Sequence, residues 1–191
     1  NLTDAFGYTA GIARSEGADR TSEYFVIRGF KAYSGVGSIY RDGTKYTVNG
    51  FNGQQELYGL ERIELLKGAS SVLYGAAAPG GLINTVSKRP STTPLREVNV
   101  EFGSFNRKQI AADFSGALDQ DNAWSYRLTG LARDSDSFID HVADDRHYFA
   151  PALKWQPNAA TSFTLLAQYQ DDRSAYVAGL PGEGTVLPNP N

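Results

Sequence analysis

Residues 60–90 read Leu60-Glu-Arg-Ile-Glu-Leu-Leu-Lys-Gly-Ala-Ser-Ser-Val-Leu-Tyr-Gly-Ala-Ala-Ala-Pro-Gly-Gly-Leu-Ile-Asn-Thr-Val-Ser-Lys-Arg-Pro90. Two short apolar runs, 63–66 and 82–86, flank small residues and glycines that suit turns. Runs of this length between glycines favour strands over helices. The stretch therefore predicts strands over 63–67 and 82–87, joined by a glycine-rich loop.

A second informative block lies upstream, where Phe25-Val-Ile-Arg28-Gly-Phe30 is followed by Tyr40-Arg-Asp42-Gly43. Together with residues 60–90, in this order and spacing, it resembles the two plug signatures of the TonB-dependent outer-membrane receptors. That family takes iron–siderophore complexes and cobalamin across the bacterial outer membrane. Two signatures in the right order are much more specific than either alone.

Two later segments extend the resemblance. Tyr126-Arg-Leu-Thr-Gly-Leu-Ala-Arg133 and Leu180-Pro-Gly-Glu-Gly-Thr-Val186 are similar to the first barrel strands and an early loop of ferrichrome and ferrioxamine receptors. The match covers nearly the whole chain. It implies an α+β plug domain followed by antiparallel transmembrane β-barrel strands, as a fragment of a larger plugged barrel of about 22 strands.

The composition changes at residues 88–94, where two prolines and three hydroxyl residues interrupt any strand or helix. We place a domain boundary there, with an N-terminally truncated plug domain over 1–89 and the first barrel strands over 90–191. About five alternating runs follow the boundary. Five strands cannot close around a plug, so we expect the remaining strands beyond Asn191.

Alternation separates a membrane barrel from a soluble β-sandwich only weakly, because both have period two. In this chain apolar residues share one face of each run, with mostly polar residues between them: Val98, Val100 and Phe102; Ile110, Ala112 and Phe114; Trp124, Tyr126, Leu128 and Gly130; Phe163, Leu165, Ala167 and Tyr169, the last set alternating with Thr164, Leu166 and Gln168. The alternative to a receptor is a soluble extracellular β-rich binding or adhesion module. A detergent requirement of the full-length protein would distinguish the two.

Composition argues against several other classes of protein. A net charge of −3 and a pI near 5.4 are not those of a nucleic-acid binder. The chain has no cysteine, and its two histidines, six residues apart, match no metal-ligand spacing. No histidine accompanies the carboxylates of Asp42, Glu61 and Glu64, so we predict no enzyme activity. The absence of methionine leads us to expect a fragment that lacks both ends.

Arg28 follows three apolar residues, which predicts a buried strand and a guanidinium paired with carboxylates. The resemblance implies that Arg28 and Lys67 pair with barrel glutamates and lock the plug in the lumen. Most relatives have arginine where this chain has Lys67. An ammonium cannot form the two-pronged bond, so a weaker lock is expected. The alternative for Lys67 is an ordinary exposed residue at a strand end.

The resemblance also places siderophore contacts in plug loops, at Glu16, Ser34, Gly35 and Phe51, with Tyr33 adjacent. Relatives have arginine at the position of Glu16 and tyrosine at that of Phe51, so the exact ligand cannot be carried over. The aromatic set Tyr33, Tyr40, Tyr46, Phe51 and Tyr58 has few charges around it and suits a ferric hydroxamate better than an anionic catecholate. The alternative for each ring is packing in the plug core.

The function implied by the resemblance is binding of a ferric siderophore and its TonB-coupled import. No cofactor is expected, since iron travels inside the siderophore. The implied partners are the siderophore, the TonB-ExbB-ExbD complex acting through a TonB box outside this chain, and outer-membrane lipid, without nucleic acid. The implied location is the bacterial outer membrane.

Overall fold

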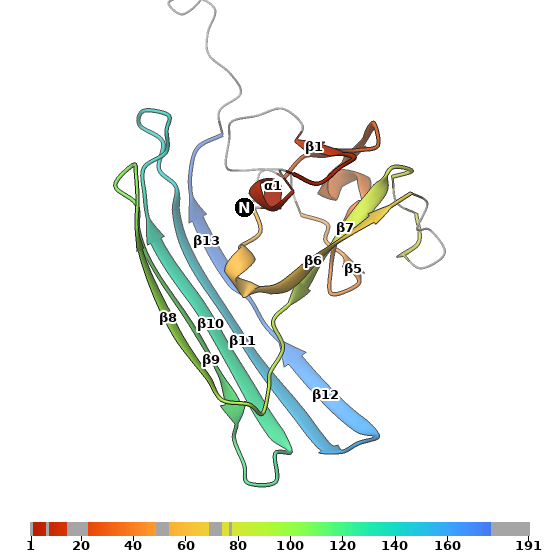
Figure 1. The fold of residues 1–191 in the computed structure, drawn as a ribbon, viewed down its shortest axis with the longest axis vertical. Helices are drawn as coiled ribbons and strands as arrows, with labels where there is room; N and C mark the ends of the chain where they lie inside the picture. The colour runs from red at the N-terminus through yellow and green to blue at the C-terminus, as the bar shows by residue number, and fades with distance from the viewer. Residues whose placement is uncertain are drawn as a thin grey trace, which may run out of the picture.

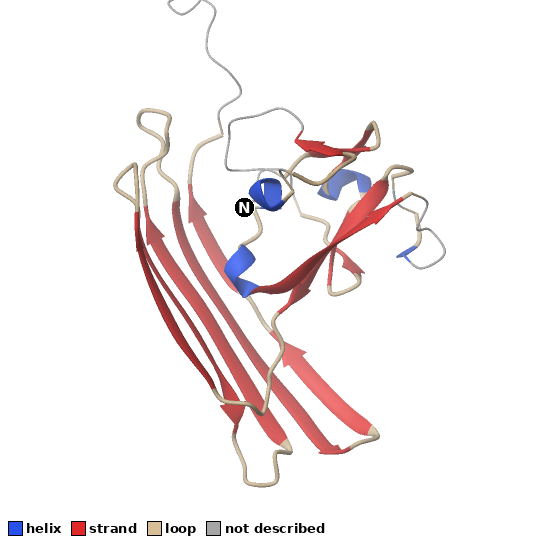
Figure 2. Cartoon of the chain, viewed as in Figure 1, coloured by secondary structure: helices blue, strands red, loops and turns tan. Residues whose placement is uncertain are grey.

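The computed structural model describes residues 2–6, 8–14, 23–48, 54–68, 74–76 and 78–176, which form three sheets. Two small sheets lie beside one large, six-stranded sheet that curves along one side of them (Figure 1). We call the small sheets and their helices the plug region, and the large sheet the wall. The helices of the described chain lie in the plug region (Figure 2), and none is long and apolar enough to cross a membrane.

The plug region combines short strands with single helical turns. One sheet has the order β1-β2-β3 and the other β5-β4-β7-β6, with β4 and β7 parallel and the other pairs antiparallel. The elements are α1 (Leu2–Ala5), β1 (Ile12–Arg14), β2 (Phe25–Ile27), β3 (Phe30–Ala32), η1 (Ser34–Val36), β4 (Ile39–Arg41), β5 (Thr44–Lys45), η2 (Leu57–Gly59), β6 (Leu60–Lys67) and β7 (Gly81–Ser87). Strands β6 and β7 are the two that residues 60–90 predict.

A single apolar cluster joins the two small sheets to α1. Its buried members are Leu2, Phe25, Ile27, Ala32, Ile39 and Ile83. The glycine pair at the start of β7 allows the sheets to approach, because a Cβ on Gly80 would overlap the carbonyl oxygen of Ile27 and Gly81 has φ +140°. These two positions explain why residues 60–90 need two consecutive glycines here.

The wall consists of β8 (Leu95–Phe102), β9 (Lys108–Ala117), β10 (Trp124–Asp134), β11 (Asp145–Asn158), β12 (Thr161–Leu166) and β13 (Tyr169–Arg173), all antiparallel. Residues 88–94, before β8, form neither helix nor strand. The domain boundary at residue 89 stays a prediction.

Strands β12 and β13 are one strand with a gap, since both pair with β11 in the same register. Pro151 of β11 explains the gap. Its carbonyl accepts a hydrogen bond from Ala167 N–H at 3.0 Å, but proline has no N–H to return the second bond of the pair. The six wall strands therefore occupy five positions in the sheet.

The two faces of the wall reverse the usual pattern of burial. The outward face is apolar and exposed: Val100 is 60% exposed, and Val98, Ile110, Leu128, Phe149, Phe163 and Leu165 are also exposed. The inward face is polar and buried beneath the plug region, where Thr129 and Asp113 are each 1% exposed. Such an outward face is expected of a sheet that borders lipid.

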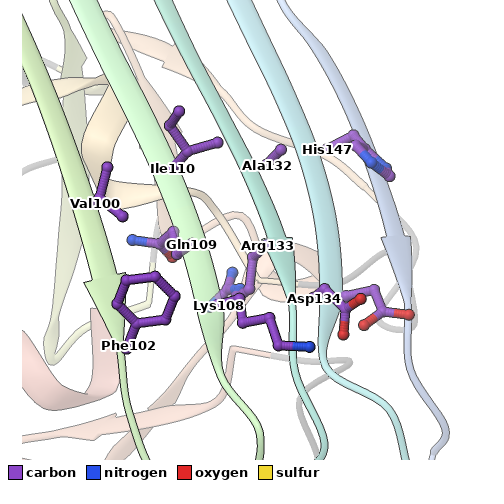
Figure 3. A pocket seen from close by; sticks show the side chains of 10 residues that line it. Val100, Phe102, Lys108, Gln109, Ile110, Ala132, Arg133, Asp134 and His147 are labelled. Carbon is purple, nitrogen blue, oxygen red and sulfur yellow. The ribbon is translucent and has the colours of Figure 1, made fainter.

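The apolar band ends differently at the two edges of the wall. The turn edge consists of residues 118–123 and 159–160. Next to these turns, the rings of Trp124 and Trp155 stack with their centroids 5.9 Å apart. The loop edge consists of residues 103–107 and 135–144. Next to these loops, charged side chains follow the apolar residues of the band (Figure 3). There Val100 and Ile110 lie beside Lys108 and Asp134, around a shallow hollow of about 370 Å³. Aromatic and charged rims of this kind match the two interfaces of a membrane.

The band predicts a depth-dependent cost for outward charges. Leu128→Arg, in the middle of β10, should lower the free energy of unfolding in lipid vesicles by about 2–4 kcal/mol. Phe102→Arg, at the loop edge, should lower it by less than about 1 kcal/mol. Denaturant titration of the full-length protein in vesicles measures both values. Equal losses would contradict the assignment of the outward face.

Candidate functional site

The loop at η1 holds three of the predicted ligand residues. The Tyr33 ring packs against Tyr24, with centroids 4.9 Å apart, and lies over Gly35, where a Cβ would crowd it. Ser34 Oγ donates to the carbonyl of Val48 at 3.1 Å. These contacts make Tyr33, Ser34 and Gly35 a compact, partly exposed unit. Its role in ligand binding stays a prediction, and Glu16 and Phe51 lie outside the described residues.

Most of the predicted aromatic set serves packing in the described chain. Tyr40 is 2% exposed and donates its hydroxyl to the carbonyl of Tyr74 at 2.6 Å. Tyr46 packs against the plug core. Tyr58 lies under Lys88 Nζ, 4.3 Å from its ring centroid, and donates to Glu97 of the wall at 3.2 Å. Of the four described rings, only Tyr33 belongs to the η1 loop.

Arg28 is exposed among the described residues, although Phe25 and Ile27 before it are buried as expected. The burial of its guanidinium against barrel carboxylates stays a prediction. Strand β2 ends at Ile27, and Arg28 and Gly29 form the two-residue turn to β3, with φ of 53° and 88°. Positive φ at both central positions is the hairpin geometry that suits the twist of the strands. The turn directs the side chain away from the core that buries Phe25 and Ile27.

Arg28 and Lys67 nevertheless lie close together. Arg28 Nη1 would be 3.3 Å from a Cβ on Gly68, the residue after Lys67, and Lys67 Nζ donates to the carbonyl of Ala10 at 2.6 Å. Strand β6 begins near the wall and ends at Lys67 on the other side of the plug region (Figure 1). Neither cation forms an ion pair within the described parts of the chain. Their pairing with barrel glutamates stays a prediction.

A different set of charges joins the plug region to the wall. It consists of one arginine of the wall, one carboxylate of the plug region and one carboxylate of the wall. Arg146 of β11, 7% exposed, donates from Nη1 to Glu56 Oε2 at 3.0 Å. Its Nε and Nη2 donate to Asp172 of β13 at 2.6 and 2.9 Å. We call Glu56, Arg146 and Asp172 the Glu56 clamp. A buried arginine held by two carboxylates has its charge satisfied, as burial requires.

Two further contacts fix the segment around the clamp. Gln170 Nε2 donates to the carbonyl of Gln54 at 2.8 Å. Gly59 closes η2 directly against Tyr148 of β11, and a Cβ at this glycine would overlap the Tyr148 ring. The glycine is therefore required for the wall and the plug region to meet here.

A second junction, which we call the Asp113 junction, lies where the chain passes from β7 to the wall. Asp113 of β9 accepts from Lys88 Nζ at 2.6 Å and from Arg127 Nε and Nη2 at 2.9 and 2.8 Å. Arg89 also pairs with Asp42 of the plug region at 2.9 Å. The sequence offers one signal for these contacts: Arg127 and Arg146 occupy inward, polar positions of alternating strands. Their partners could not be read from the sequence.

Glu23 is a partly buried carboxyl of the plug region. Its two oxygens accept from the backbone N–H of Gln55 at 2.8 Å and from Gln55 Nε2 at 3.3 Å. Burial raises the pKa of Glu23 from its usual 4.5 to about 7, and the Gln55 hydrogen bonds oppose this rise only in part. In the described residues no group of three or more acidic or histidine side chains is arranged to hold a metal ion.

The contact between Gly59 and Tyr148 predicts a rescuable defect. Gly59→Ala should destabilise the full-length protein by about 1–3 kcal/mol, because the added methyl meets an aromatic ring. Adding Tyr148→Leu should reduce that cost to less than about 1 kcal/mol relative to Tyr148→Leu alone. Denaturant unfolding of the four proteins measures both costs, and an equal cost in both backgrounds would show that the ring is not the obstacle.

The raised pKa of Glu23 predicts a pH-dependent stability. The folded state holds this proton more tightly than the unfolded state does, so Glu23 makes the plug region less stable as pH rises from about 4.5 through about 7. Glu23→Gln keeps the acceptor for Gln55 N–H and removes the titration. It should be more stable than the parent by up to about 3 kcal/mol at pH 8 and equal to it near pH 4.5. Hydrogen exchange of the Gln55 peptide at both pH values, corrected for intrinsic rates, is the measurement. The same pH dependence in both proteins would count against the assignment.

Comparison with known proteins places this geometry in a family. Residues 1–82 match the model of the TonB-dependent receptor plug domain. The chain is 42% identical to the ferrichrome outer membrane transporter/phage receptor of Escherichia coli K12, over 100% of this chain and 26% of the relative. It is 36% identical to the ferrioxamine receptor of Yersinia enterocolitica, over 97% of this chain and 26% of the relative. The chain thus spans about a quarter of the length of these curated relatives.

Solved structures agree with the sequence matches. The closed form of the ferric-catecholate import receptor of E. coli K12 superposes with a TM-score of 0.83 at 25% identity, over 97% of this chain and 26% of that chain. The pyoverdine outer membrane receptor of Pseudomonas aeruginosa, bound to pyoverdine, gives 0.80 at 27% identity, over 90% and 25%. Both the plug region and the wall are included at this coverage. The chain belongs to the TonB-dependent outer-membrane receptors and comprises the plug domain and the first strands of the β-barrel.

Proposed function

We propose that the full-length protein binds a ferric siderophore of the hydroxamate type at the outer membrane and imports it in a TonB-coupled step. The observation that carries the proposal is the 42% identity, along the entire chain, to a ferrichrome transporter. Two further relatives, at 36% and 32% identity, are ferrioxamine receptors. Ferrichrome and ferrioxamine are both hydroxamates.

The fold alone does not select the ligand. Receptors for catecholate and pyoverdine superpose on this chain with TM-scores of 0.83 and 0.80, so the same plug and wall serve several siderophore classes. Ligand choice must then come from side chains in the loops. Tyr33, packed against Tyr24 and lying over Gly35, is the described residue best placed to contribute an aromatic surface.

The chemistry of the cargo sets what the protein must supply. Three hydroxamates fill the coordination shell of a ferric ion, so the receptor needs no metal ligand and no cofactor. A bulky and weakly charged complex is bound by apolar and aromatic walls with a few hydrogen-bond donors. The named relatives are transporters and receptors, and we propose no catalytic role.

The proposed partners follow from the family. Energy would come from the TonB-ExbB-ExbD complex acting on a TonB box outside this chain, and the apolar outward face of the wall would contact outer-membrane lipid. Transport requires the plug region to rearrange while the wall stays in the membrane. The Glu56 clamp and the Asp113 junction are the contacts that such a rearrangement must keep or break.

Binding of defined siderophores tests the proposal. The purified full-length receptor should bind ferrichrome or ferrioxamine B at least about tenfold more tightly than a ferric tris-catecholate, a difference of about 1.4 kcal/mol. Tyr33→Ala combined with Phe51→Ala should weaken hydroxamate binding by at least about tenfold. Tyr33→Phe, which keeps the ring on Tyr24, should bind nearly as the parent does. Isothermal titration is the measurement.

Two outcomes would count against the proposal in different ways. If neither hydroxamate bound, the ligand class would be wrong. If the double alanine variant bound normally while folding in normal amounts, the ligand site would lie outside the plug loops.

A further inference from the structure

Residues 54–56, which we call the bridging segment, lie between the wall and the two small sheets. All three are buried, and each forms a hydrogen bond to a different element. These bonds join the Gln54 carbonyl to Gln170 of β13 at 2.8 Å, Gln55 Oε1 to Thr85 of β7 at 2.9 Å, and Glu56 to Arg146 of β11 at 3.0 Å. The bridging segment thus fixes the β5-β4-β7-β6 sheet to the wall.

Glu23 joins the third sheet, β1-β2-β3, to the same segment. Its carboxylate accepts from the backbone N–H of Gln55 at 2.8 Å and from Gln55 Nε2 at 3.3 Å. It forms no ion pair in the part of the chain that the structure describes. Gln55 is only 3% exposed, so without Glu23 its N–H would lose an acceptor that water cannot readily replace. The bond therefore holds the start of β2 to the bridging segment.

The β2–β3 hairpin carries this fixed position to the η1 loop. In its register Phe25 faces Ala32, so the next facing positions are Tyr24 and Tyr33. Their rings pack with centroids 4.9 Å apart, as facing side chains of an antiparallel pair do. Glu23 directly precedes Tyr24, and η1 begins directly after Tyr33. The place of the Tyr33 ring thus depends on where Glu23 is held.

A continuous set of direct contacts therefore runs from the wall to the predicted ligand loop. Its steps are Gln170 to the bridging segment, Gln55 to Glu23, and Tyr24 to Tyr33. Contiguous contacts can carry energetic coupling between distant groups, and its size is measured by combining mutations at the two ends.

We propose that Glu23 is a positioning residue for siderophore binding, which holds the Tyr24–Tyr33 pair in place relative to the wall through the bridging segment. The inference rests on the proposed function, because it takes the η1 loop as a ligand surface. It adds that a wall residue remote from that loop, Gln170, sets the ligand affinity. Neither Glu23 nor Gln170 needs to touch the siderophore.

Variants of Glu23 test the positioning role. Isothermal titration would use the full-length receptor and whichever of ferrichrome and ferrioxamine B the parent binds more tightly. Glu23→Ala should raise the dissociation constant at least about tenfold. Glu23→Gln, which keeps an acceptor for Gln55 N–H, should restore most of the affinity. In a Tyr33→Ala background, adding Glu23→Ala should raise the dissociation constant by less than about twofold, because the ring that Glu23 positions is absent.

Variants of the wall test the other end of the contacts. Gln170→Ala removes the donor to the Gln54 carbonyl and should raise the dissociation constant at least about fivefold, again only when Tyr33 is present. Gln168→Ala is the matched control, because Gln168 is an exposed glutamine two residues before Gln170. It should stay within about twofold of the parent value. A plug that was merely destabilised would not show this dependence on Tyr33.

Hydrogen exchange gives a reciprocal measurement, since coupling between two sites acts equally in both directions. The Gln55 amide donates to Glu23, so its exchange reports the opening of that bond. Saturating ligand should slow the exchange of this amide at least about fivefold in the parent and by less than about twofold in Gln170→Ala.

The possible failures are distinguishable. If the parent bound neither siderophore, the proposed function would fail, and the inference with it. If the parent bound and Tyr33→Ala bound equally well, ligand import would stand but the inference would be overturned. Equal effects of Glu23→Ala with and without the Tyr33 ring would also overturn it. Should Glu23→Ala fail to fold, Gln170→Ala decides, and an unchanged dissociation constant in that folded variant would contradict the proposal.

Discussion

The Glu56 clamp is the interaction on which the arrangement of plug region and wall depends. Arg146 is buried, and a buried arginine that loses one of its carboxylates is left with an uncompensated charge, at a cost of about 3–5 kcal/mol. Glu56 at η2 and Asp172 on β13 therefore hold each other's positions through Arg146. Gly59, which admits the Tyr148 ring, and Gln170, which donates to the Gln54 carbonyl, hold the same segment against the wall.

The wall was predictable because its signal is local. Period-two alternation in residues 98–169 specifies which side chains share a face whatever the rest of the chain does, and the structure keeps those faces. The paired glycines of residues 80–81 likewise mark a close backbone approach. The end of strand β2 at Ile27 was not predicted, because three apolar neighbours indicate a buried strand but do not say where it ends. The two-residue turn at Arg28 and Gly29 decided that.

The clamp was not predictable from the sequence. Glu56 and Arg146 are 90 residues apart, and their contact depends on the register of β11 against β10 and on the angle at which η2 meets the wall. The same applies to Asp113, whose partners Lys88 and Arg127 come from different elements. The ligand loop was placed by family resemblance, whereas the bond between Glu23 and Gln55 follows only from side-chain positions. The plug region is thus joined to β8–β13 at two charged junctions, while Arg28 and Lys67 lie at the opposite end of β6.

A double-mutant cycle on Glu56→Gln and Arg146→Met tests the central claim most directly. The free energy of plug unfolding in the full-length receptor would be measured for the four proteins, with the exposed pair Arg62 and Glu64 as a reference cycle. The account predicts a coupling energy of at least about 1.5 kcal/mol for the buried pair and less than about 1 kcal/mol for the exposed pair. A coupling near zero between Glu56 and Arg146 would contradict it.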